Sequence, residues 1–218
     1  DKLIEKKIRK LINKKFPNHS ITGEEEAPFV VKGSDYEWII DPIDGTKAFI
    51  LGQPTWSNLV GLYYKKKPVI SLANFPILGK CYYADDKGAY LLMNNKLKRI
   101  KSNNLKKIKE AKMITNSIHT FINTKIFNFF SNYEYFFKIT GSDAYNFCLV
   151  CEGKTDILFE CGLKQVDILP LKKLILKSGA SITNWRGNDD TSNGDVVVAS
   201  NNKLNSEFIK ILKKSKII

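Results

Sequence analysis

The chain has 218 residues, 43% of them hydrophobic and 26% charged, a composition typical of a globular protein that excludes disorder, collagen and coiled coil. No apolar run reaches the roughly 18 residues that cross a bilayer, so we expect no membrane span and a cytoplasmic protein. The net charge is +13, but only Arg9, Arg99 and Arg186 are arginines, so the lysine excess predicts a solvated basic surface rather than specific recognition of nucleic acid.

The chain begins at Asp1 without a methionine, and we expect a fragment or a processed product. Its two histidines, His19 and His119, leave little room for a histidine triad or a multi-histidine metal cage. Cys148 and Cys151 form a C-x-x-C without the second pair that a structural zinc site needs. We expect them to be buried free thiols in a reducing compartment.

The first half of the sequence predicts a helix followed by strands. Apolar residues recur at helical spacing over residues 3–16, and Pro17 ends the pattern. Strands are expected at residues 19–22, 36–40, 59–64, 68–74, 81–84 and 89–92, the last four as two hairpins. This half is therefore expected to be a helix with a largely antiparallel sheet.

From about Ala111 the pattern alternates strands with helices, which is typical of α/β structure. Strands are expected at residues 112–115, 136–139 and 156–159, and helices at 123–130, within 141–153 and at 168–178, before closing strands and a terminal helix. We therefore predict two halves packed together, an α+β half over residues 1–110 and an α/β half over residues 111–218.

The segment Asp41-Pro42-Ile43-Asp44-Gly45-Thr46 follows an apolar strand. Two carboxylates three positions apart, where a strand gives way to a helix, can converge on one hard cation such as Mg²⁺. Gly45 allows the backbone to approach an anion, and Thr46 offers a backbone N–H at a helix start, where phosphate binds favourably. The alternative is ordinary turn chemistry with Thr46 as a cap.

Two further acidic features favour the metal site over a simple turn. Glu24 and its two neighbouring glutamates follow Gly23 on a predicted loop just upstream, although such a run is usually a solvated surface. Asp167 lies late in the chain between an extended segment and a helix start. As a helix N-cap it could still bind a metal through its other oxygen.

The motifs Gly23-Glu24-Glu25, Trp38 to Thr46 (WIIDPIDGT), Gly141-Ser142 and Gly162 to Asp167 stand in the order found in the inositol monophosphatase superfamily, which this sequence resembles over essentially its whole length. The resemblance implies a layered αβαβα sandwich of the inositol monophosphatase (sugar phosphatase) type, with α+β and α/β parts. It also implies a Mg²⁺-dependent, lithium-sensitive phosphatase that is commonly a homodimer.

The resemblance assigns metal ligands residue by residue. Glu24, Asp41 and the carbonyl of Ile43 match the ligands of a first Mg²⁺, and Asp41, Asp44 and Asp167 match those of a second. Two or three bound ions would polarise the ester phosphate, activate a water and neutralise the leaving oxygen.

Other matching positions complete the implied site. Asp1 falls where the superfamily has an aspartate that assists a third, weaker metal. Glu24 and Thr46 match the pair that orients the attacking water, and a carboxylate there can take the proton of that water. No covalent phosphoenzyme is required.

The substrate side of the site is expected in the second half of the chain. Glu160 matches a position that contacts the organic part of the substrate, and a carboxylate there suits an ammonium, an imidazolium or polyol hydroxyls. Asp143, which follows Gly141 and Ser142, is a further acidic candidate. The pair Gln165-Val166 departs from the pattern usual before the last aspartate, so the shape of the pocket there is open.

The segment Lys47 to Leu59, with Pro54-Thr55-Trp56, most resembles the histidinol-phosphatase branch, as does Thr183 to Gly187. This implies hydrolysis of histidinol phosphate and a place in histidine biosynthesis. Trp56 could equally anchor the core beneath the site loop.

Four functions remain open from the sequence. We expect a Mg²⁺-dependent phosphomonoesterase acting on histidinol phosphate. The alternatives within this class are an inositol-1-phosphate phosphatase and a broad sugar or nucleotide phosphatase. An alternative of another class is a catalytically dead, basic nucleic-acid-binding protein on the same scaffold, against which the intact carboxylate set argues.

Overall fold

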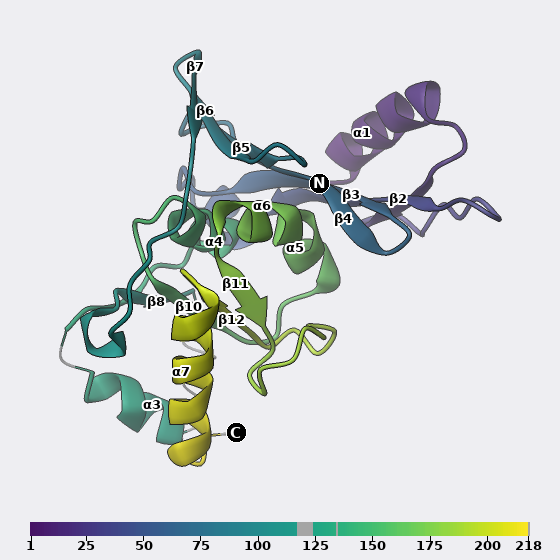
Figure 1. The fold of residues 1–218 in the computed structure, drawn as a ribbon. Helices are drawn as coiled ribbons and strands as arrows, with labels where there is room; N and C mark the ends of the chain where they lie inside the picture. The colour runs from purple at the N-terminus through teal and green to yellow at the C-terminus, as the bar shows by residue number, and fades with distance from the viewer. Residues whose placement is uncertain (117–123, 134, 218) are drawn as a thin grey trace. The chain divides into compact units, whose positions relative to one another are not determined.

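The computed structural model describes residues 1–116, 124–133 and 135–217 (Figure 1). The chain forms two compact units, with residues 1–99 and 166–174 in unit one and residues 100–165 and 175–218 in unit two. A short segment from late in the sequence, which includes Asp167, therefore belongs to the unit formed by the first part of the chain. A folding boundary near Ala111 stays a prediction.

Unit one is built on a sheet that has seven strands among the described residues, arranged in sequence order. These strands are β1 (Ser20–Gly23), β2 (Tyr36–Asp44), β3 (Ser57–Tyr64), β4 (Lys67–Phe75), β5 (Lys80–Ala84), β6 (Ala89–Met93) and β7 (Lys96–Arg99). The pair β1 and β2 is parallel, and every later neighbouring pair is antiparallel. The predicted helix with a largely antiparallel sheet is confirmed.

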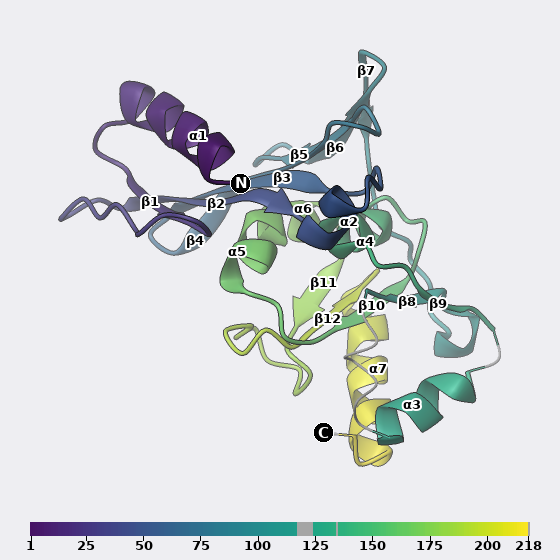
Figure 2. The same ribbon diagram turned by 180° about the vertical axis from the view of Figure 1, so that it is seen from behind.

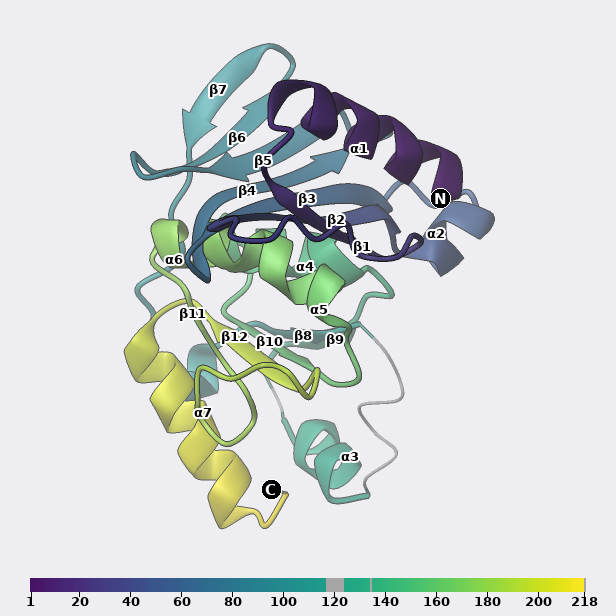
Figure 3. The same cartoon turned by 90° about the vertical axis from the view of Figure 1, so that its right-hand side faces the viewer.

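Helix α1 (Lys2–Lys15) lies against one face of this sheet (Figure 3). Its buried Ile12 forms a cluster with Ile21 of β1 and Ile40 of β2, and Ile8 and Trp38 pack against that cluster. The 3.6-residue periodicity of the sequence matches this face only in part, because Leu3 and Leu11 are exposed and the polar Glu5 is buried.

Strand β7 was not predicted from the sequence. All four of its residues are exposed, and three of them are basic. Its only apolar side chain, Leu97, gives no alternation that would signal a half-buried strand. Lysines on an edge strand also discourage further strand pairing, which explains the unusual composition.

Unit two contains a mixed sheet in the strand order β11-β12-β10-β8-β9. The bounds are β8 (Met113–Thr115), β9 (Phe137–Ile139), β10 (Ile157–Glu160), β11 (Ser181–Thr183) and β12 (Val196–Ala199). Strand β8 pairs in parallel with β9 and β10, whereas β12 is antiparallel to β10 and β11. The other elements are the 3₁₀ turn η1 (Ile108–Glu110) and helices α3 (Thr124–Ser131), α4 (Asp143–Cys151) and α7 (Asn202–Lys214).

Aromatic side chains dominate the core of unit two. Phe159 of β10 contacts Phe130 of α3 and Phe208 of α7, with ring centroids 5.6 Å away in both cases. Phe129 of α3 also contacts Phe208 of α7, with ring centroids 6.0 Å apart. The predicted start of α3, at Asn123, lies outside the described residues.

The single helix predicted over residues 168–178 is instead three short elements. They are α5 (Gln165–Ile168), the 3₁₀ turn η3 (Leu169–Leu171) and α6 (Lys172–Ser178). Pro170 explains the break, because proline has no N–H to donate and its ring clashes with the preceding helical turn.

Cys148 and Cys151 are buried and free on α4, as predicted. In the part of the chain that the structure describes, every helix is too short or too polar to span a membrane.

Candidate functional site

The sequence motif DPIDGT lies inside and just after β2, which continues four residues beyond its predicted end. Along the pairing with β3, Asp41 is opposite Leu59 and Asp44 is opposite Ser57. Three steps on β2 therefore correspond to two on β3, which is a β-bulge. Residues three apart in a regular strand point to opposite faces. The extra residue restores the parity, so both carboxylates can point to the same side.

Gly45 connects the end of β2 to helix α2 (Thr46–Ile50) and is the N-cap residue of that helix (Figure 2). Its φ of 75° lies in the left-handed region that glycine adopts without steric cost. The Thr46 hydroxyl donates to the carbonyl of Ile43 over 3.3 Å. The predicted strand-to-helix turn is therefore present, with Thr46 folded back over the motif.

Two polar residues of β3, which were not predicted from the sequence as part of the site, support this turn. The Ser57 hydroxyl donates to Oδ2 of Asp44 over 3.1 Å. The Asn58 amide donates to the carbonyl of Pro42 over 2.7 Å. In the sequence, these two polar residues at the start of an otherwise apolar strand could have indicated the contact, because a buried polar side chain needs a hydrogen-bond partner.

Asp167 reaches the same region from α5. It lies within this short helix rather than at its N-cap, so the capping alternative is wrong. Its neighbour Val166 packs against Ile39 of β2 and Tyr63 of β3. The Tyr63 hydroxyl donates to the carbonyl of Leu169 over 3.0 Å. These contacts hold the Asp167 segment on the sheet of unit one.

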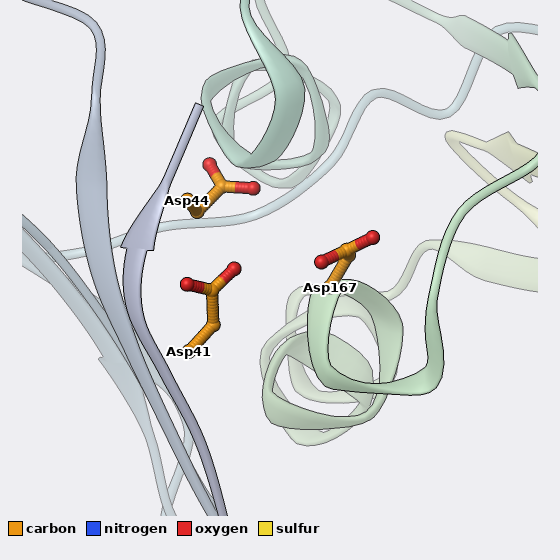
Figure 4. Close-up of side chains that lie close together, drawn as sticks. All are labelled: Asp41, Asp44 and Asp167. Carbon is orange, nitrogen blue, oxygen red and sulfur yellow. The ribbon is translucent and has the colours of Figure 1, made fainter. Parts of the chain in front are cut away.

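Asp41, Asp44 and Asp167 converge, with one carboxylate oxygen from each lying within 4.8 Å of the others (Figure 4). Asp41 and Asp44 are buried, and Asp167 is half-buried. Figure 4 shows the three side chains pointing toward one another from β2 and α5. Carboxylates at this separation repel each other unless protons or a cation neutralise them.

The electrostatics of Asp41 indicate that this cluster fits a cation. Burial, followed by the like charges of Asp44, Glu24 and Asp167, raises the pKa of Asp41 from 3.8 to about 10. Its buried Oδ1 atom has no hydrogen-bond partner among the described residues. An all-oxygen set with an unsatisfied carboxylate oxygen suits a hard divalent ion such as Mg²⁺.

Glu24 lies beside this cluster, and a hydrogen bond between the side chains of Glu24 and Asp41 also raises the pKa of Asp41. The Glu24 N–H donates to the carbonyl of Ile40 over 3.2 Å, which places it just beyond the paired part of β1. Asp1 occupies the exposed N-cap position of α1.

The predicted substrate residues Glu160 and Asp143 are joined by Asn116 within unit two. The Asn116 N–H and the Thr115 hydroxyl donate to Oε1 of Glu160, the latter over 3.1 Å. The Asn116 side-chain amide donates to Oδ1 of Asp143. Burial raises the pKa of Glu160 to about 8, and nearby Asp143 adds to the rise while the Asn116 and Thr115 hydrogen bonds oppose it.

Asn116 was not singled out from the sequence, because an asparagine after a strand is an ordinary turn signal. Gly141 and Ser142 immediately precede α4, with Gly141 at a φ of 66° and Ser142 at the N-cap.

Trp185 stacks on Phe159 with ring centroids 4.5 Å apart, and its indole N–H donates to the carbonyl of Glu160. Trp56 meets the edge of Phe49 at 5.1 Å, which is a packing contact.

The sequence matches the inositol monophosphatase family over residues 1–216. The chloroplastic bifunctional phosphatase IMPL2 of Arabidopsis thaliana is 32% identical over 195 residues, which cover 86% of this chain and 54% of that protein. The chain thus spans about half the length of this relative. The fructose-1,6-bisphosphatase/inositol-1-monophosphatase of Aquifex aeolicus is 30% identical over 98% of this chain and 80% of its own length.

Two other relatives carry different names. A histidinol-phosphatase of Streptomyces coelicolor is 27% identical over 98% of this chain and 82% of its own length. A Nus factor SuhB of Vibrio cholerae is 28% identical over 92% of this chain and 76% of its own length.

Among solved structures, an inositol monophosphatase from Anabaena (Nostoc) superposes with a TM-score of 0.87 at 21% identity, covering 98% of this chain and 86% of that one. This likeness confirms the fold class that the sequence resemblance implied. Together with the family match over nearly the whole sequence, it shows that this chain belongs to the inositol monophosphatase family of phosphatases.

Proposed function

We propose that this phosphatase is a Mg²⁺-dependent phosphomonoesterase that hydrolyses a small phosphate monoester, with histidinol phosphate as its substrate. The observation that carries the metal dependence is the convergence of Asp41, Asp44 and Asp167, with an unsatisfied buried oxygen on Asp41. In this proposal Asp41, Asp44 and Asp167 hold one cation, while Asp41, Glu24 and the Ile43 carbonyl hold another. Asp1 assists a third.

When bound, the divalent cations would supply positive charge to the phosphate and its leaving oxygen and lower the pKa of water. Glu24 accepts the proton of the attacking water on its carboxylate, and Thr46 orients that water through its hydroxyl. Gly45 and Thr46 offer the phosphate an approach to the backbone at the start of α2.

Histidinol phosphate is favoured because its organic part carries an ammonium and a titratable imidazole, whereas an inositol phosphate carries only hydroxyls beside its phosphate. Glu160 and Asp143 supply two carboxyl groups linked through Asn116. Gly141 and Ser142 complete the substrate side at the start of α4. The relatives named histidinol-phosphatase and the Pro54-Thr55-Trp56 segment support this choice.

Phosphate release from a substrate panel tests the proposal. The panel contains histidinol phosphate, inositol 1-phosphate, a nucleoside 3′,5′-bisphosphate and glycerol phosphate, each with Mg²⁺ and with EDTA. We expect Mg²⁺-dependent turnover with the highest kcat/KM for histidinol phosphate. A preference for inositol 1-phosphate would overturn the substrate and keep the phosphatase, whereas undiminished turnover in EDTA would overturn the metal dependence.

Glu160→Gln separates substrate binding from a structural role. With its pKa raised to about 8, Glu160 is ionised only above that pH, so the assay is run there. A charge-assisted contact is then worth about 1.5–3 kcal/mol, and its loss should lower kcat/KM for histidinol phosphate roughly tenfold to a hundredfold. Turnover of glycerol phosphate, whose organic part is uncharged, should hardly change. Equal losses on both esters would make Glu160 a structural residue.

A second candidate function is nucleic-acid binding, which the net charge of +13 and the relatives named Nus factor SuhB favour. It predicts an affinity for nucleic acid that falls steeply with salt concentration. We propose instead that the protein has no specific nucleic-acid partner, contacts no membrane and works as a cytoplasmic homodimer.

Inhibition of phosphate release by Li⁺ would support the proposed Mg²⁺-dependent mechanism.

A further inference from the structure

Glu5 of α1 carries a carboxylate that is fully buried, although glutamate is rarely buried without a partner. Oε2 accepts the N–H of Glu25 over 2.9 Å, and Oε1 accepts the N–H of Glu26 over 3.2 Å. Arg9, one turn later on α1, donates its Nε–H to Oε1 over 2.7 Å. The carboxylate of Glu5 thus accepts hydrogen bonds from the backbone of the loop after β1.

Arg9 reinforces the same contact. Its second donor reaches the carbonyl of Glu26 over 3.1 Å, so the pair Glu5 and Arg9 binds both sides of one peptide segment. Only 12% of the Arg9 side chain is exposed. A charged pair withdrawn from water is a costly way to attach a helix, because apolar residues of similar volume would do so at least as well.

Gly23 shows that the loop is fitted closely around this carboxylate. A Cβ atom on Gly23 would clash with the carboxylate of Glu5, because it would lie only 2.1 Å from Oε1. The φ of Gly23 is not in the left-handed region, so the backbone itself would accept alanine. Glycine is needed at this position for space, and the occupant of that space is Glu5.

Glu24 lies between two anchors. On one side, Gly23 pairs with Ile40 of β2, and the Glu24 N–H donates to the Ile40 carbonyl over 3.2 Å. On the other side, the next two N–H groups are held by Glu5. The backbone of Glu24 is therefore fixed where its side chain meets Asp41, the residue after Ile40.

We propose that Glu5 is a positioning residue for the metal site: its buried carboxylate, paired with Arg9, fixes the loop from Gly23 to Glu26 so that Glu24 faces Asp41. The inference rests on the proposed role of Glu24. Glu5 itself touches neither metal nor substrate and acts through the amides of Glu25 and Glu26.

The first test is Glu5→Gln, which keeps the shape but loses the charge and sets a donor against the loop amides. We expect the Mg²⁺ Kd from calorimetry to rise about tenfold, the loss typical of one charge-assisted hydrogen bond. Hydrogen exchange at the amides of Glu25 and Glu26 should become faster. In turnover assays the Mg²⁺ activation constant should rise while KM for the ester stays nearly constant.

The matched control is Asp156→Asn in unit two. Asp156 is also buried and also accepts a backbone N–H, from Lys112 over 2.9 Å, together with the Asn103 amide. We expect this variant to lose thermal stability without a change in Mg²⁺ Kd. If Glu5→Gln behaves in the same way, Glu5 is merely structural and the inference is overturned.

A double-mutant cycle keeps the inference testable if Glu5→Gln folds poorly. Gly23→Ala should weaken Mg²⁺ binding in the presence of Glu5 and have little further effect in a Glu5→Ala background, where the space is free. Additive effects would contradict the inference. If the wild-type chain hydrolyses no ester, the proposed function fails, and the binding and exchange measurements still decide the role of Glu5.

Discussion

Asp41 is the residue on which the site depends most. Asp44, Glu24 and Asp167 each raise the pKa of Asp41. Its Oδ1 atom has no hydrogen-bond partner among the described residues, unlike Asp44, whose Oδ2 accepts a hydrogen bond from Ser57. In the proposed site Asp41 would help to hold the cations, and a ligand contact at Oδ1 would displace no hydrogen bond at that atom.

We predict that Asp41→Asn or Asp44→Asn abolishes turnover while the fold is retained. Each change removes a charged ligand, and even residues that only support a metal ligand typically contribute about 10–100-fold, so the loss should be larger. Phosphate release at low millimolar Mg²⁺ and circular dichroism are the measurements. Asp35→Asn, at an exposed ion pair with Lys65, is a suitable control. Near wild-type activity in either site variant would refute the metal assignment.

The raised pKa of Glu160 predicts how the free energy of unfolding depends on pH. Because burial raises its pKa from 4.5 to about 8, the folded state holds this proton more tightly than the unfolded state. The contribution of this proton to the free energy of unfolding is complete below pH 4.5. It decreases by roughly 1.4 kcal/mol per pH unit as the pH rises from 4.5 to about 8. Glu160→Gln should lack this pH dependence in urea unfolding, and an unchanged profile would contradict the prediction.

At the scale of elements, the docking of α5 and η3 on the sheet positions Asp167. Gly61 of β3 is in contact with Pro170, and a Cβ at Gly61 would lie 2.7 Å from the Pro170 Cα atom. The Tyr63 hydroxyl holds the carbonyl of Leu169. Pro170 therefore has two roles, because it interrupts the helix and also packs against Gly61 of β3.

We predict that Gly61→Ala lowers the free energy of unfolding by roughly 1–3 kcal/mol, as overpacking does, and weakens Mg²⁺ binding by displacing Asp167. Tyr63→Phe removes only the hydrogen bond to Leu169, so it should cost about 1 kcal/mol and leave Mg²⁺ binding nearly intact. Denaturant unfolding and calorimetry measure both effects. Equal Mg²⁺ affinity in Gly61→Ala and the wild type would show that this contact does not set the site.

At the scale of the whole molecule, a chain with a net charge of +13 contains a cluster of like-charged carboxylates. The general positive charge suits a phosphatase, because it favours the approach of an anionic ester. It does not neutralise the cluster, since three aspartates within 4.8 Å are far closer to each other than a Debye length of about 8 Å.

We therefore predict that metal and pH act together on stability. The raised pKa of Asp41 means that the metal-free protein is most stable below pH 3.8 with respect to this group and loses stability as the pH rises toward about 10. Mg²⁺ should reverse that loss and bind more tightly at higher pH, because it competes with the proton. Thermal unfolding from pH 5 to 9, with Mg²⁺ and with EDTA, checks this. A Mg²⁺-induced rise in Tm that is independent of pH would contradict it.

The sequence by itself determined most of the secondary structure and the main carboxylates of the site. The apolar periodicity of residues 3–16 and the alternation in the hairpins predict α1 and β3 to β6, because both signals come from which side of an element is buried. The motif from Asp41 to Thr46 identifies its own turn, since a glycine after a strand permits the left-handed φ that Gly45 adopts.

Only the tertiary structure decided which of these residues meet. The bulge that turns Asp41 and Asp44 to one side depends on pairing with β3, and pairing is not encoded locally. Strand β7 depends on its pairing with β6, and the seating of Pro170 depends on its packing against Gly61. Likewise, Glu5 looks like any solvent-exposed helix residue in the sequence. Its burial follows from the loop that folds around it, because a carboxylate is buried only where the rest of the chain supplies donors.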